Sequence, residues 1–522
     1  MQISYTKNYF KIYATQLSAV AINVLSLVIV IPYLSGNASV YGIYSLCISF
    51  TIFFSYADIG FLNAGYKYAS EYYAQGNREK ETQITGFITF ILATFVLIFS
   101  VVLILFALNP QWLIKNISGT GDTHIAKSLL LTLALFSPNM VLQRMLQIIY
   151  GIRVQEYILQ TILIVVNVVK IALVYFFIGR DTYNIQGYFL SCQAISTAGL
   201  LFGLLYARSK YNISLKALTA NIRFSKEVFQ HIKSLAFNSL YITIAWILFY
   251  EFDPYVIAKL SGAEAVAFYS IGLTCLAFFR SIFGSLFGPF NARFNHFIAF
   301  NDLDGLITFS KTVMCILLPA VVFPTLSLAL LSKPFVFAWV GSLFHESVGI
   351  VTFLSLCNIL GFVTYPAGIL SMATKKTKLL YIISSLQVII YWSGIAVTFP
   401  KNGYIVFAWF ELVCFSLTSI LYIGFICSFL QLNFFRFIKE IILPAIIPVI
   451  LLLLALLFSR GFLPLIKGKL YLFEVILTGA SASLIATLVY YFTSEIFRKY
   501  INRVFVKFHR TYSKLTLKNI FL

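Results

Sequence analysis

Four basic side chains lie within long apolar stretches of the sequence, where a charged residue is uncommon: Arg144, Lys170, Arg280 and Lys311. A charge inside a membrane-spanning helix is costly, so it usually faces a cavity or a partner of opposite charge. Arg can bind two oxygens of a phosphate at once, whereas Lys acts as a point charge. These residue types suit the binding of an anionic group. Arg144 and Lys311 could instead extend to the nearby membrane surface.

Three acidic side chains lie in or beside apolar stretches of the same type: Glu251, Asp253 and Glu411. They are candidates for binding a coupling proton or sodium ion, or for pairing with the buried cations. Asp253 directly precedes Pro254, so a solvated helix end is the alternative for this residue.

The sequence offers little support for other chemistry. Its seven cysteines all lie in apolar stretches without the spacing of a zinc site or a redox pair, and its five histidines form no metal-binding motif. It contains no glycine-rich loop of the type that binds ATP. We therefore expect no metal, no cofactor and no enzyme activity.

Composition identifies the elements that must position these side chains. Of the 522 residues, 60% are hydrophobic and 11% are charged, whereas a soluble domain has about 25% charged residues. A helix needs about 20 apolar residues to cross a bilayer. The sequence predicts an all-α integral membrane protein with about fourteen such helices, centred near residues 24, 49, 95, 138, 168, 196, 245, 278, 320, 360, 388, 416, 448 and 482.

The distribution of basic residues predicts the orientation. With fourteen spans, most Lys and Arg residues lie in the even-numbered connections and in the two tails. Because basic residues are concentrated on the cytoplasmic side, both termini are predicted to be cytoplasmic. The net charge of +20 then reflects topology and attraction to anionic lipid, as in the basic tail, and indicates no nucleic-acid partner.

A short pattern recurs at an interval of about six helices. One copy is Leu34-Ser35-Gly36 with Val40 and Tyr44-Ser45, and the other is Leu260-Ser261-Gly262 with Val266 and Tyr269-Ser270. The recurrence could be due to chance, since these residue types are common in the sequence. Both copies nevertheless lie at the equivalent place, between the first and second helix of each predicted set of six. This predicts two six-helix lobes related by a parallel repeat, divided into an N-lobe with a cytoplasmic linker (1–233), a C-lobe (234–431), two further helices (432–494) and a basic cytoplasmic tail (495–522).

Several motifs resemble the polysaccharide repeat-unit flippases of the multidrug, oligosaccharidyl-lipid and polysaccharide exporter superfamily. They are Tyr56-Ala57-Asp58-Ile59-Gly60-Phe61, Phe252-Asp253-Pro254-Tyr255 followed by Leu260-Ser261-Gly262, and Trp339-Val340-Gly341 with Phe344. The resemblance covers the first twelve helices, and the last two match only in number and apolarity. It implies a bacterial inner-membrane flippase of undecaprenyl-diphosphate-linked oligosaccharide, for O-antigen, capsule or a similar glycan, that works by alternating access.

On this resemblance, Arg144, Lys170 and Arg280 would contact the diphosphate. Asn167 and Asn238 would hydrogen-bond the sugars, although amides within membranes also join neighbouring helices. The expected partners are the lipid-linked substrate, membrane lipids, and a glycan polymerase or glycosyltransferases.

Three other functions are alternatives for a membrane protein of this type. A multidrug or cation antiporter of the same superfamily would be expected to have twelve helices and more cavity acids than cations. A peptidoglycan-precursor flippase would carry arginines in its first two helices, and the first predicted span has none. A membrane polysaccharide polymerase would need a long outward loop, whereas the longest connection, from Arg208 to Lys233, is predicted to face inward.

Overall fold

The computed structural model describes residues 5–55, 60–117, 119–179, 182–288, 290–373, 377–429 and 433–503. All regular elements in these ranges are helices. The described chain forms two compact units, Met1–Ser270 and Ile271–Leu522. This division falls within a helix after the predicted boundary at 233/234, and the predicted domain limits stay a prediction.

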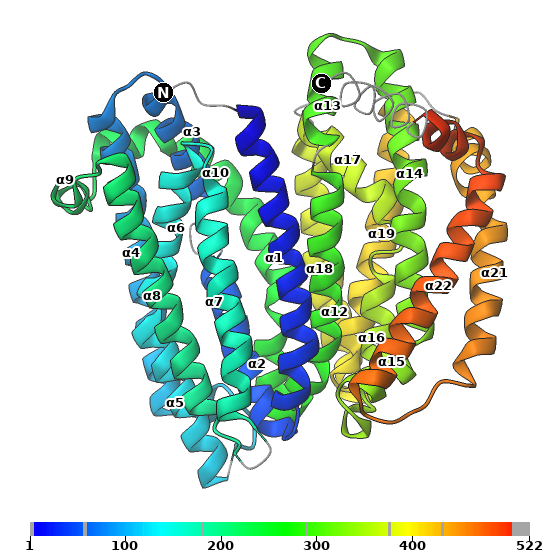
Figure 1. The fold of residues 1–522 in the computed structure, drawn as a ribbon, viewed down its shortest axis with the longest axis horizontal. Coiled ribbons are helices and arrows are strands. Elements are labelled where there is room, and N and C mark those ends of the chain that lie inside the picture. Colours follow the sequence, from blue (N-terminus) through cyan, green and yellow to red (C-terminus); the bar gives the residue numbers. More distant parts are fainter. Residues whose placement is uncertain are drawn as a thin grey trace, which may run out of the picture. The chain divides into compact units, whose positions relative to one another are not determined.

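The first unit contains eleven α-helices and the start of a twelfth within the described ranges (Figure 1). Their bounds are α1 Tyr5–Leu34, α2 Ala38–Ser55, α3 Phe61–Ala74, α4 Arg78–Leu108, α5 Thr120–Phe136, α6 Pro138–Gly151, α7 Glu156–Phe177, α8 Ile185–Tyr211, α9 Leu215–Ala220, α10 Lys226–Trp246, α11 Asp253–Ser261 and α12 Ala263–Phe287. Helix α1 packs along α7, and α4 along α3 and α5.

The second unit comprises the rest of α12 and the helices that follow it. Their bounds are α13 Phe290–Ala299, α14 Leu303–Leu330, α15 Ser332–Trp339, α16 Ser347–Leu356, α17 Gly361–Ala373, α18 Thr377–Asn402, α19 Ile405–Phe429, α20 Phe434–Phe437, α21 Leu443–Arg460 and α22 Lys469–Thr493. Helix α14 lies against α16, α17, α21 and α22, so it forms the centre of this unit.

Local sequence explains where the long helices begin. The Asn77 side chain accepts a hydrogen bond of 3.0 Å from the Lys80 backbone N–H at the start of α4. The Asn184 and Asp302 side chains do the same for α8 and α14, at 2.8 and 2.9 Å. These caps satisfy backbone donors that have no partner within the helix. In α4, acidic residues in the first turn also favour the positive end of the helix dipole.

The all-α prediction is confirmed, whereas the number of spans is not settled at fourteen. Within the described ranges, eleven helices are long and apolar enough to cross a membrane, and the number rises to thirteen if each of two bent helix pairs is one span. The remaining predicted centre, near residue 49, falls in the shorter apolar segment Ala38–Phe53. Asp58 of the first family-like motif lies outside the described residues.

The two copies of the repeated pattern both occupy turns between helices. Ser35 and Gly36 follow the end of α1, and Gly262 separates α11 from α12 with a φ of +91°. Lys115 caps the second turn: its backbone N–H donates to the Ala258 carbonyl at 2.9 Å, and its Nζ donates to the Leu260 carbonyl at 3.0 Å. A cation at a helix C-terminus complements the helix dipole.

Helices α2 and α12 approach closely where α2 carries Gly42. A Cβ atom at this position would overlap the Ala263 carbonyl group and press on the Ala267 backbone. Because the obstacle is backbone rather than a flexible side chain, the two helices would have to separate.

We expect Gly42→Ala to destabilise the protein by about 1–3 kcal/mol, the usual cost of overpacking. The melting temperature of the purified protein in detergent measures the effect. Gly424→Ala in α19 is the matched control, because a Cβ there meets nothing within 4 Å. Equal melting temperatures for the two variants would contradict the proposed close contact.

Candidate functional site

The first unit contains a broken helix that buries two of the predicted ion-coupling residues. Helix α10 ends in a π-helical turn, Ile247–Glu251, and α11 continues at Asp253 after a bend of 42°. Pro254 lacks a backbone N–H and so favours a break at this point. Glu251 is 5% exposed and Asp253 is 0% exposed, which excludes a solvated helix end as the environment of Asp253.

The buried carboxylate of Asp253 accepts a hydrogen bond from the Tyr269 hydroxyl of α12. Tyr269 belongs to the second copy of the repeated pattern and is itself fully buried. The Tyr255 side chain lies near Glu251 and packs against the Phe50 ring, with 4.5 Å between ring centroids. The two acids are therefore enclosed by aromatic residues from α2, α11 and α12, an environment in which a carboxylate needs a hydrogen-bond donor.

The second unit has a similar break in a helix. Arg280, a predicted diphosphate contact, and Glu411, a predicted ion-coupling residue, lie near it. Helices α16 and α17 are bent by 51° at the turn that begins with Cys357. Arg280 of α12 and Glu411 of α19 both lie within electrostatic range of the Cys357 thiol. Arg280 also lies within electrostatic range of the Tyr365 hydroxyl of α17.

Glu411 is the more deeply enclosed of the two charged residues, with 1% of its surface exposed. Because Glu411 and Arg280 both lie near Cys357, this break has a carboxylate and a guanidinium in the same neighbourhood. A carboxylate is suited to a cation and a guanidinium to an anion.

The cations and amides predicted in the first unit lie on three different helices. Lys170 of α7 is half-buried near the Cys192 thiol of α8. Asn167 is almost one turn earlier on α7, and its amide donates to the Asn23 side chain of α1 at 3.3 Å. Arg144 of α6 is half-buried and donates to Gln147 at 2.8 Å.

The roles of these residues in substrate binding stay a prediction. The Asn167 contact matches the alternative in which an amide joins two helices. Asn238 lies in α10, but its side chain is outside the described part of the chain.

Lys311 has a structural partner that the sequence did not reveal. Its Nζ lies 2.5 Å from Glu440 in the π-helical turn Ile438–Ile442, which leads into α21. The pair joins α14 to the segment that leads into α21. Within the same unit, Ser327 lies 3.0 Å from Ser483 of α22, and the Gly468 N–H donates to the Ala338 carbonyl at 3.0 Å.

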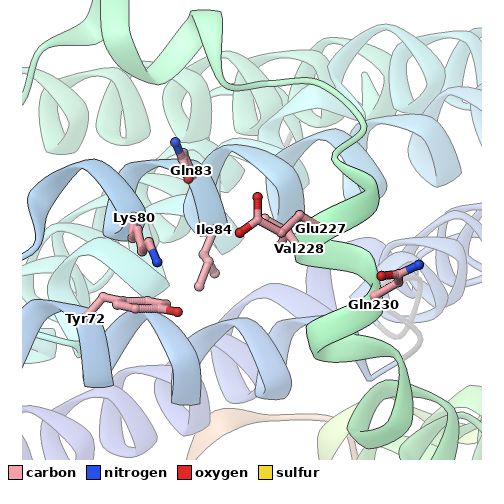
Figure 2. Close-up of a pocket in the computed structure, with 7 residues that line it drawn as sticks. All are labelled: Tyr72, Lys80, Gln83, Ile84, Glu227, Val228 and Gln230. Carbon is pink, nitrogen blue, oxygen red and sulfur yellow. The ribbon is translucent and has the colours of Figure 1, made fainter.

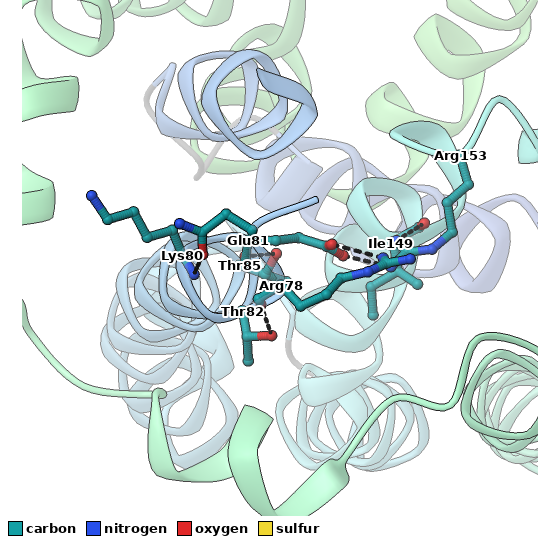
Figure 3. Close-up of polar contacts among 8 residues, drawn as sticks. Arg78, Lys80, Glu81, Thr82, Thr85, Ile149 and Arg153 are labelled. Atoms are coloured by element: carbon teal, nitrogen blue, oxygen red, sulfur yellow. Dashed lines mark hydrogen bonds and ion pairs between the residues drawn. The ribbon is translucent and has the colours of Figure 1, made fainter. Parts of the chain in front are cut away.

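A buried ionic network was also missed by sequence reasoning (Figure 3). Arg153, in the turn between α6 and α7, lies 2.5 Å from Glu81 in the first turn of α4, with side chains 4% and 8% exposed. Arg153 also donates to the Ile149 carbonyl at 2.8 Å, and Arg78 binds the second Glu81 oxygen at 2.9 Å. The Arg153 guanidinium lies 4.9 Å from the ring centre of Tyr73. The network fastens α3, α4 and α6 together at one end of the unit.

We expect Arg153→Met to destabilise the protein by about 3–5 kcal/mol, because Glu81 would then be buried without its main counter-ion. Combining it with Glu81→Leu should recover most of the loss, as measured by melting temperature in detergent. Lys499→Ala, which removes the exposed pair with Glu495, should leave the melting temperature unchanged. An additive double variant would show that the two buried groups do not interact.

Comparisons with known proteins identify the fold. No family model and no curated protein matches the sequence. Among solved structures, the lipid II flippase MurJ in an inward closed conformation aligns with a TM-score of 0.66 and 13% identity, over 93% of this chain and 99% of that chain.

Other transporters of known structure also share the fold. A multidrug resistance MATE family transporter of the MOP superfamily, in its outward-facing conformation, aligns with a TM-score of 0.54 and 12% identity, over 82% and 97% of the two chains. A MOP superfamily transporter from Pyrococcus furiosus aligns with a TM-score of 0.53 and 13% identity, also over 82% and 97%. The chain is a multi-pass membrane protein with the fold of MOP-superfamily transporters.

Proposed function

We propose that the chain is a MOP-superfamily transporter that flips undecaprenyl-diphosphate-linked oligosaccharide from the cytoplasmic to the outer leaflet of a bacterial inner membrane. The observation that carries this proposal is the extent of the fold match. The lipid II flippase accounts for 93% of this chain, whereas the MATE transporter accounts for 82% although nearly its whole length aligns. The excess is comparable to α21 and α22, with 18 and 25 residues.

The physics of the reaction explains why such a protein is needed. Each hydroxyl without a hydrogen bond costs about 4–8 kcal/mol in an alkane-like medium, and a diphosphate adds a large desolvation penalty. The protein must give the polar head group a hydrated path while the lipid tail stays in the bilayer. Outward movement of each negative charge gains about 2.3 kcal/mol per 100 mV of membrane potential, which supplies part of the driving force.

In this proposal the predicted residues keep distinct roles. Lys170, Arg280 and Arg144 contact the diphosphate, and Asn167 and Asn238 contact sugars. The buried acids Glu251, Asp253 and Glu411 bind a coupling ion or hold a cation in place. Their burial beside helix breaks supports the proposal, because non-helical backbone in transporters typically lines a binding site.

The proposal also includes the broader biological setting. The glycan is used for O-antigen, capsule or a similar envelope polysaccharide, with glycosyltransferases and a polymerase as partners. Both termini are cytoplasmic, and the substrate site is exposed in turn to the two sides of the membrane by alternating access.

A multidrug or cation antiporter is the second candidate. It is favoured by the buried acids Glu251, Asp253 and Glu411 and by the shared fold of the MATE transporter. Cation antiport requires a carboxylate that can exchange a proton for its substrate. Drug resistance of cells that overproduce the protein, with normal surface glycan when it is deleted, would favour this candidate.

Lys170→Ala and Arg280→Ala are each expected to abolish surface glycan without lowering the amount of protein in the membrane. The physical reason is the loss of a charge that offsets desolvation of the diphosphate. Surface glycan staining and immunoblotting of a deletion strain carrying each variant measure the two effects. Lys378→Ala is the matched control, because Lys378 is exposed near the start of α18. Normal glycan in both variants would remove these residues from the proposed site.

A further inference from the structure

A polar pocket lies in the first unit, and none of its lining residues is a predicted transport residue (Figure 2). Its volume is about 300 Å³, and it is formed where α3, α4 and the first turn of α10 meet. The lining residues are Tyr72, Lys80, Gln83, Ile84, Glu227, Val228 and Gln230. Ile84 and Val228 belong to the buried apolar cluster beneath it, so the pocket has an apolar floor and a polar rim.

Two opposite charges face one another across this pocket. Figure 2 shows the Lys80 ammonium, from α4, and the Glu227 carboxylate, from α10, both directed into the space between their helices. No ion pair joins them, and Glu227 has no ion-pair partner among the residues that the structure describes. The Lys80 Nζ lies 5.4 Å from the centre of the Tyr72 ring.

This charge pattern selects the class of ligand. A simple anion would be attracted by Lys80 but repelled by Glu227, and a simple cation would experience the reverse. A small dipolar molecule satisfies both charges, with its negative group on Lys80 and its positive group on Glu227. The amides of Gln83 and Gln230 add hydrogen-bonding capacity at the rim.

The level of the pocket indicates where its ligand comes from. The charged first turn of α4 is followed directly by an apolar span, and Ile84 lies at the transition. Tyr residues of α3 and clustered basic residues are typical of the boundary between a membrane and water. A ligand at this depth is within reach of phospholipid head groups.

We propose that this pocket binds the phosphoethanolamine head group of a membrane phospholipid. The phosphate lies at Lys80, and the primary ammonium donates hydrogen bonds to Glu227. A choline head group has no N–H to donate, so it binds more weakly, and a glycerol head group leaves Glu227 facing the phosphate. This site does not depend on the identity of the transported substrate.

Native mass spectrometry of the full chain tests the proposal, with phosphatidylethanolamine, phosphatidylcholine or phosphatidylglycerol added in detergent. We expect preferential retention of phosphatidylethanolamine. Lys80→Gln and Glu227→Gln should each weaken it about tenfold, the loss of one hydrogen bond to a charged group. Glu71→Gln and Lys233→Gln are matched controls, because both residues are exposed and neither lines the pocket.

The other outcomes overturn the proposal in distinguishable ways. Equal retention of all three lipids, or equal effects of the pocket and control variants, would show that no specific site exists. Stronger phosphatidylglycerol binding that only Lys80→Gln removes would identify a simple anion site. Binding of soluble glycerophosphoethanolamine, with no preference among the lipids, would show that the ligand is a soluble molecule and not a membrane phospholipid.

Discussion

The hydrocarbon of a bilayer offers no hydrogen-bond partner to a peptide group, and this constraint governs the structure. A helix meets the constraint within itself, which accounts for the purely helical elements of the described ranges. Serine and threonine side chains inside the spans follow the same rule. The hydroxyls of Ser49, Thr85 and Ser100, for example, each donate to the carbonyl four residues earlier.

The two places where spans are broken are therefore informative. Each break frees backbone groups, and each lies near ionisable side chains: the buried Glu251 and Asp253 in one unit, and the buried Glu411 with the half-buried Arg280 in the other. The hydrogen bond that Asp253 accepts from Tyr269 offsets part of the cost of its burial. Ionisable side chains and broken helices occur together because the backbone groups freed at a break and the buried side chains can satisfy one another's hydrogen bonds in an apolar setting.

Long apolar runs predicted the helices well, because membrane spans carry the strongest pattern in any sequence. Partners distant in sequence were not predictable. The apolar surroundings of Lys311 predict a cavity or surface charge, yet this residue pairs with Glu440. Nothing in the sequence around Arg153 distinguishes it from the other basic residues of the connections, yet it is buried against Glu81. An ion pair between two helices leaves no local periodic signal. The burial of Asp253 was likewise hidden, since a residue before proline often lies at an exposed helix end.

Helices α21 and α22 are joined to α14 and α15 near both ends and in the middle, through Lys311, Ser327 and Ala338. Through these contacts, the pair of helices α21 and α22 forms part of the packed structure of the second unit and stabilises α14. A shortened chain ending after α19 would leave a lysine without its counter-ion and expose the Phe323 ring, now covered by Tyr490, to acyl chains. Ancestral gain or loss of this pair of helices would thus have required compensating substitutions along α14.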